Sequence, residues 1–212
     1  MKTYSYKKTR TKGMISGLLS LAMIGAGVAL IASFIFAGGL GTVASNSADP
    51  GGFSIPSLGG GDDASAGGPE DTTLRLTIPD MSRVDDAEIP STQGTDIEAL
   101  DSNKAIHLAG TGFPWQDEAN VYIAGHRLGY PASDSFLAFY DLPNLENGDE
   151  VFVTDAEGTR YTYEVFEQTT VPPTDLSVTE PVPGRNILTL QTCTLPDYSQ
   201  RLVVQAELVE VA

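Results

Sequence analysis

An uncharged apolar stretch near the N-terminus constrains this chain more than any other feature of its sequence. Met14 to Ala37 spans 24 positions without a charged residue. A helix needs about 20 apolar residues to cross the hydrocarbon core of a bilayer. The stretch therefore predicts a transmembrane helix over residues 14–37. A cleaved signal peptide is the alternative, although its apolar region normally covers only about 7–15 residues.

The distribution of charge predicts how that helix is oriented. The chain carries 12 basic and 28 acidic residues, a formal net charge of −16. Five of the basic residues precede the span, whereas all the acidic residues follow it. The positive-inside rule predicts that residues 1–13 form a cytoplasmic tail and that the chain after the span lies outside the cell. An acidic exported part also argues against nucleic acid as a partner, because phosphate binding needs a basic surface.

Two regions with different compositions follow the span. Residues 38–73 are rich in Gly, Ser, Ala, Asp and Pro and show no helix or strand period. Such a segment cannot bury enough apolar surface to offset its ordering entropy, so it predicts a flexible linker. Residues 74–212 then show strand patterns and form the predicted folded domain.

Short β-rich runs predict that this domain is all-β. Apolar and polar residues alternate, or β-branched and aromatic residues cluster, in six runs: Leu74–Ile78, Val121–Ile123, Glu150–Thr154, Tyr161–Val165, Ile187–Thr192 and Leu202–Val209. Two short helices are expected, one after a capping box from Thr95 to Glu98 and one over Ser135–Tyr140. Many short strands with few helices indicate a closed barrel or a sandwich.

The single cysteine, Cys193, is the first candidate for chemistry. One interpretation is a small buried apolar residue, which is common for a free thiol. The strand pattern favours another. Residues two apart share a face of a strand, so Leu188 and Leu190 lie on one face and Cys193 on the other. The leucines belong in the core, and the thiol is therefore expected on the more polar side.

Two further polar residues share this parity. Arg201 begins a run in which Leu202 and Val204 form the apolar face, so Arg201 points the other way. His126 follows the run Val121–Gly125 with the parity opposite to its apolar residues. A solvated loop histidine and a solvated strand-end arginine are the alternatives.

Several motifs resemble the sortase family of cysteine transpeptidases. Thr189–Cys193 looks like the signature Thr-Leu-x-Thr-Cys, and Ile123–Arg127 resembles the histidine motif. Arg201 lies on the strand after the cysteine, as in that family. The resemblance covers roughly residues 74–209 and is greatest to the class E sortases of actinobacteria. Ile106–Thr111, where the family usually reads Gly-His-Tyr-Pro-Gly-Thr, departs from the pattern.

The resemblance implies an eight-stranded sortase-like β-barrel and a defined reaction. Cys193 would be the nucleophile, because a thioester remains reactive toward amines. His126 would transfer protons, and Arg201 would hold the negative charge on the substrate oxygen. The substrate would be a sorting signal such as Leu-Pro-x-Thr-Gly or Leu-Ala-x-Thr-Gly, cut between Thr and Gly. The acceptor would be an amine of a cell-wall peptide or a pilin.

Other residues and other functions remain open from the sequence. Substrate contacts are expected from Thr192, Tyr122, Tyr130 and Leu195, although each also fits a packing role. A hydrolytic cysteine protease would suit the same three catalytic residues, and a non-catalytic surface adhesion domain would need none of them. No cofactor is expected. No metal is expected either, because one Cys and two His do not make a zinc site and no loop has calcium-ligand spacing.

Overall fold

The computed structural model of this protein describes residues 67–212. The tail predicted for residues 1–13, the span predicted for residues 14–37 and the linker as far as residue 66 lie outside the described residues. Within residues 67–212, no helix is long and apolar enough to cross a membrane.

Strands dominate the described part of the chain, and all six predicted strands are confirmed. The bounds are β1 Leu74–Thr77, β2 Ala87–Ile89, β3 Ser91–Thr92, β4 Ile106–Leu108, β5 Ala119–Ala124, β6 Glu150–Thr154, β7 Arg160–Val171, β8 Asn186–Cys193 and β9 Arg201–Val211. The three strands that the sequence did not predict, β2, β3 and β4, are two or three residues long. A run that short is too brief to show a period.

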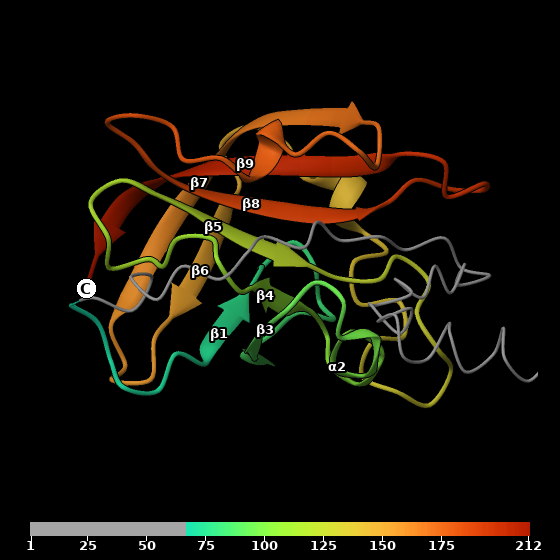
Figure 1. The fold of residues 1–212 in the computed structure, drawn as a ribbon, viewed down its shortest axis with the longest axis horizontal. Helices are drawn as coiled ribbons and strands as arrows, with labels where there is room; N and C mark the ends of the chain where they lie inside the picture. Colours follow the sequence, from blue (N-terminus) through green and yellow to red (C-terminus); the bar gives the residue numbers. More distant parts are fainter. Residues whose placement is uncertain (1–66) are drawn as a thin grey trace, which may run out of the picture. The chain divides into compact units, whose positions relative to one another are not determined.

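The strands form a nearly closed barrel, as Figure 1 shows. Over residues 67–212 they make one sheet in the order β2-β1-β6-β7-β9-β8-β5-β4-β3. The two end strands are consecutive in the chain and are separated only by Pro90. β2 pairs with β1, and β3 pairs with β4. Counted as one extended segment, residues 87–92 are the eighth strand and connect the two ends of the sheet. The all-β barrel prediction is confirmed.

A buried histidine holds this junction together. The Nδ1 atom of His107 in β4 lies 3.0 Å from the Oγ of Ser91 in β3, and its Nε2 lies 3.0 Å from the carbonyl oxygen of Gly112. The backbone amide of His107 donates to the carbonyl of Pro90. Burial lowers the pKa of His107 to about 4, so its ring is neutral at physiological pH.

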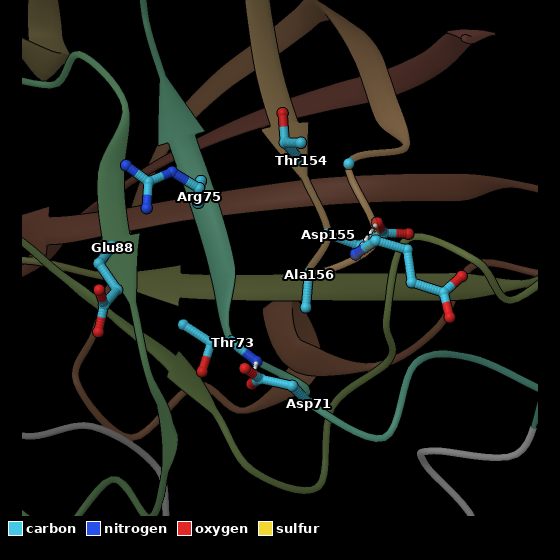
Figure 2. A pocket seen from close by; sticks show the side chains of 9 residues that line it. Asp71, Thr73, Arg75, Glu88, Thr154, Asp155 and Ala156 are labelled. Atoms are coloured by element: carbon cyan, nitrogen blue, oxygen red, sulfur yellow. Dashed lines mark hydrogen bonds between the residues drawn. The ribbon is translucent and has the colours of Figure 1, made fainter.

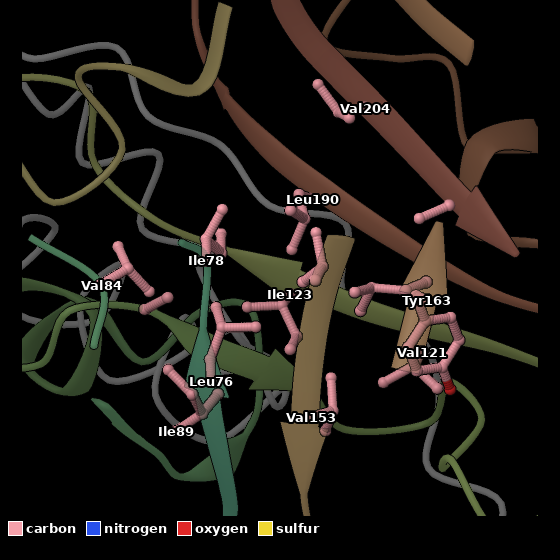
Figure 3. Packing of buried hydrophobic residues seen from close by; sticks show 14 of the residues in the cluster. Leu76, Ile78, Val84, Ile89, Val121, Ile123, Val153, Tyr163, Leu190 and Val204 are labelled. Atoms are coloured by element: carbon pink, nitrogen blue, oxygen red, sulfur yellow. The ribbon is translucent and has the colours of Figure 1, made fainter. Parts of the chain in front are cut away.

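Alternating side chains fill the inside of the barrel. Figure 3 shows apolar residues from strands far apart in sequence pointing toward one another, among them Leu76 of β1, Ile123 of β5 and Leu190 of β8. Leu188, Leu190 and Val204 belong to this core, as their parity predicts. Burying each such side chain stabilises the fold by roughly 1.5–3 kcal/mol.

The two helix predictions have different outcomes. α2 covers Ile97–Ser102, but its N-cap is Asp96, whose side chain accepts a hydrogen bond from the amide of Ala99. The capping box from Thr95 was therefore one residue too early. Residues 135–140 form successive turns instead of the predicted helix. Leu137 has a positive φ of 55° and donates its amide to the carbonyl of Leu128. This tertiary contact overrides the local helical pattern.

Candidate active site

The candidate site lies where three adjacent strands meet at one edge of the barrel. β5 and β8 run parallel, with Ala124 paired to Gln191, so their C-terminal ends lie side by side. β9 runs antiparallel to β8 and begins at the same edge. Figure 1 shows these three strands next to one another. The topology thereby brings together the end of β5, which precedes His126, the end of β8 at Cys193, and the start of β9 at Arg201.

Cys193 and Arg201 face each other across the β8–β9 ladder. They are the last pair in the register of these strands. Directly opposite residues in an antiparallel pair project to the same side of the sheet, with Cβ atoms about 4.5–5.5 Å apart. The structure therefore confirms that the two side chains share one face.

Arg201 is almost completely buried. It is 2% exposed, and its Nη1 donates to the backbone carbonyls of Tyr198 and Gln200 at 3.1 and 3.2 Å. Both carbonyls belong to the loop between β8 and β9, so this loop holds the guanidinium beside the thiol. A buried cation needs such acceptors, because removing it from water is costly. The surface-charge interpretation of Arg201 is wrong.

Contacts with β8 position the segment that carries His126. The amide of Gly125 donates to the carbonyl of Gln191 at 3.0 Å, and the hydroxyl of Thr192 donates to the carbonyl of Gly125 at 2.8 Å. Gly125 itself lies close to neighbouring atoms, so a side chain there would be crowded. A Cβ there would lie 3.0 Å from the carbonyl oxygen of Lys104. The chain before His126 is therefore attached to the strand that ends at Cys193.

His126 makes a side-chain hydrogen bond that the sequence did not predict. Its Nε2 lies 2.8 Å from the Oδ1 of Asp101 in the last turn of α2. The His126 residue is 8% exposed, so it is not a solvated loop histidine. No sequence pattern relates two residues that are 25 positions apart and on different elements, and only the packing of α2 against the end of β5 reveals the contact.

The face that carries Cys193 is covered. Cys193 is 2% exposed and lies in a small apolar cluster separate from the barrel interior. The cluster also contains Leu100, Ile106, Leu108, Tyr122 and Ala124, with Ala99, Val178 and Tyr198 packed against it. The parity prediction is confirmed, since Leu188 and Leu190 point the other way. Thr189 and Gln191 share this more polar face, and the face is nevertheless buried, because α2, β4 and the chain around Val178 pack on it.

The four predicted substrate-contact residues occupy different environments. Tyr122 is fully buried and its hydroxyl donates to the side chain of Gln191, while burial raises its pKa. Thr192 is also buried and bonded to Gly125. Tyr130 is 43% exposed, and its ring meets the His126 ring edge-on at 5.7 Å between centroids. Leu195 is half-buried in the β8–β9 loop. Of the four, Tyr130 contacts the candidate catalytic histidine most directly.

A hollow of about 450 Å³ lies away from the candidate catalytic residues (Figure 2). It is formed by the chain before β1, by β1 and β2, and by the turn between β6 and β7. Its basic member, Arg75, is paired with Asp86 at 2.5 Å. Within residues 67–212, no group of three His, Cys, Asp or Glu side chains could hold a metal ion. The described residues that line the hollow therefore offer no such metal site.

The family model described as the Sortase domain matches residues 76–209. Sortase A of Streptococcus agalactiae is 35% identical over 89 residues, which are 42% of this chain and 36% of that protein. Sortase A of Bacillus anthracis is 30% identical over 140 residues, which are 64% of this chain and 59% of that protein. The matches thus span between about a third and three fifths of these curated relatives.

Solved structures give the same result for the fold. Sortase C2 of Group B Streptococcus Pilus Island 1 has a TM-score of 0.57 at 28% identity, over 67% of this chain and 76% of that one. Sortase C-1 of Actinomyces oris has a TM-score of 0.56 at 31% identity, over 66% and 75%. A lid mutant of sortase A from Corynebacterium diphtheriae has a TM-score of 0.56 at 29% identity, over 66% and 72%.

Proposed function

This chain belongs to the sortase family, since the family model covers more than half of it, and from that premise we propose that it is a cysteine transpeptidase acting on surface proteins. The observation that carries the proposal is the pairing of Cys193 with Arg201 at the edge where His126 follows β5. A nucleophile, a proton carrier and a permanent cation at one point are what acyl transfer through a thioester requires.

The proposed reaction has two halves. The thiol of Cys193 gives its proton to His126 as its Sγ attacks the peptide carbonyl, and the guanidinium of Arg201 stabilises the charge that develops on the carbonyl oxygen. His126 donates a proton to the leaving amine, which departs and leaves a thioester. An incoming amine then attacks the thioester and gives a proton back to His126. The sulfur of Cys193 leaves as a thiolate and takes its proton back from His126, and the acyl group ends on the new amine.

Substrate, acceptor and location are the finer parts of the proposal. We propose a sorting signal of the Leu-Pro-x-Thr-Gly or Leu-Ala-x-Thr-Gly type, cut between Thr and Gly, with a cell-wall peptide or pilin amine as acceptor. A single N-terminal span over residues 14–37 would anchor the enzyme, with its catalytic domain outside the cell. The similarity to class E sortases stays a prediction from the motifs, because the relatives compared above are named sortase A and sortase C.

The activity is tested with the full chain in detergent. A mixed library of sorting peptides is supplied together with a small amine, and products are identified by mass spectrometry. We expect a peptide truncated after Thr and joined to the amine, and no product from Cys193→Ala. Product that carries water in place of the amine, at saturating amine, would favour the hydrolytic protease. Turnover by Cys193→Ala would end the covalent mechanism.

A further inference from the structure

The proposed reaction assigns no role to the hydrogen bond between Asp101 and His126. The Oδ1 of Asp101 lies 2.8 Å from the Nε2 of His126, with side chains 32% and 10% exposed. At this distance the carboxylate accepts a hydrogen bond from the ring N–H. A carboxylate cannot donate when it is ionised, so the proton of a neutral His126 ring must be on Nε2.

This contact decides which ring nitrogen is able to do chemistry. In a neutral imidazole one nitrogen carries the proton and the other carries the lone pair. With Nε2–H held by Asp101, the lone pair is on Nδ1. The charge of Asp101 also compensates the ring while it carries a second proton during the reaction.

The helix that supplies Asp101 is attached to the same cluster as the nucleophile. Leu100, next to Asp101, is 1% exposed and belongs to the apolar cluster that contains Cys193. Asn103 closes the helix, with its side-chain amide donating to the carbonyl of Ala99 at 2.7 Å. A carboxylate in the last turn of a helix is opposed by the helix dipole. Its pairing with His126 offsets that cost.

From these contacts we propose that Asp101 is a positioning residue for the proton transfer at Cys193. Asp101 holds the His126 ring through Nε2 and makes Nδ1 the atom that takes the proton of the Cys193 thiol, gives it to the leaving amine and later takes one from the incoming amine. The kinetic part of this statement rests on the proposed transpeptidase activity, whereas the tautomer of His126 does not.

The tautomer is tested by ¹⁵N NMR of the full-length protein in detergent. The chain has two histidines, so the spectrum contains two rings, and His107, held by Ser91 and Gly112, is an internal reference. At a pH where both rings are neutral, we expect wild-type His126 to carry its proton on Nε2. Asp101→Asn should shift the His126 ring signals and leave those of His107 in place. Glu98→Gln, which removes an exposed charge from the same helix, should shift neither.

The kinetic test uses the same variants. We expect Asp101→Asn to lower kcat at least about tenfold with little change in KM. A positioned proton carrier contributes roughly 10²–10⁴-fold to the rate, and losing its orientation should remove a part of that factor. Asp101→Glu should recover part of the loss, and Glu98→Gln should match wild type. Circular dichroism and thermal melting of each variant report whether it is folded.

Different results overturn different statements. A proton on Nδ1 in wild type, or unchanged His126 signals in Asp101→Asn, would remove the positioning role. A kcat in Asp101→Asn that equals or exceeds the wild-type value would contradict the kinetic part of the proposal. If wild type turns over no peptide, the proposed activity fails, and the ring signals still decide the role of Asp101.

Discussion

Arg201 is the residue whose environment says most about its role. It is 2% exposed, and two carbonyls of its own loop hold its Nη1. A guanidinium presents its donors in a rigid planar fork, whereas an ammonium is a compact point charge. If the guanidinium of Arg201 both packs in the β8–β9 loop and reaches the substrate oxygen, a side chain with the same charge but another shape will not replace it.

Replacing Arg201 with Lys tests this at the level of one side chain. We expect Arg201→Lys to remain folded but to form the thioacyl intermediate roughly 10²-fold more slowly, in the range found when one oxyanion donor is lost. Single-turnover mass spectrometry of the Cys193 adduct measures this rate. Arg83→Ala, at an exposed position outside the site, is the control and should leave the rate unchanged. A wild-type rate in Arg201→Lys would show that charge is sufficient.

At the level of elements, α2 is a short helix that carries Asp101 to His126. It has six residues, and isolated helices of that length are not stable in water. Its order depends on the Asp96 cap, the buried Leu100 and the Asn103 closure. A hydrogen bond from the Ala99 amide, together with one from the Thr92 hydroxyl, lowers the pKa of Asp96, so the cap is ionised at neutral pH.

Removing the cap should loosen α2. We expect Asp96→Ala to reduce the free energy of unfolding by about 1 kcal/mol, the usual value for a lost N-cap. Thr95→Ala should change it little, because Thr95 is exposed and is not the cap. Urea unfolding followed by circular dichroism compares the two. A larger loss in Thr95→Ala than in Asp96→Ala would restore the capping box that the sequence suggests.

At the level of the whole molecule, the barrel depends on a junction at residues 87–92. Pro90 has no amide to donate, and the chain on either side of it pairs with a different strand. His107 bonds to β3 from within β4, and burial keeps its ring neutral down to a pH of about 4. The unfolded chain protonates this ring near pH 6.5. Between these two pH values, protonation of His107 therefore favours the unfolded chain.

This difference predicts how stability depends on pH. As pH falls from about 6.5 to about 4, the unfolded state binds a proton at His107 that the folded state does not, so stability is lost. The loss is on the order of 3 kcal/mol for a shift of this size. His107→Gln should be less stable at pH 7 but should lose less on acidification. Urea titrations at several pH values measure both slopes, and parallel slopes would contradict the prediction.

The sequence by itself determined six of the nine strands in residues 67–212 and the faces of their side chains. The alternation in β8 and β9 separated Leu188 and Val204 from Cys193 and Arg201, because a strand repeats every two residues whatever surrounds it. The motifs around His126 and Cys193 are also local patterns, so they indicated the family from the sequence alone. These inferences needed no knowledge of which strands are neighbours.

Only the tertiary structure decided what depends on elements far apart in the chain. The parallel pairing of β5 with β8 places His126 at the edge that holds Cys193. The packing of α2 brings Asp101 to Nε2 of His126, and the contact between Leu137 and Leu128 turns an expected helix into turns. α2 and β4 cover a face that alternation alone would leave polar. Each outcome is set by contacts between segments whose separation in sequence carries no local pattern.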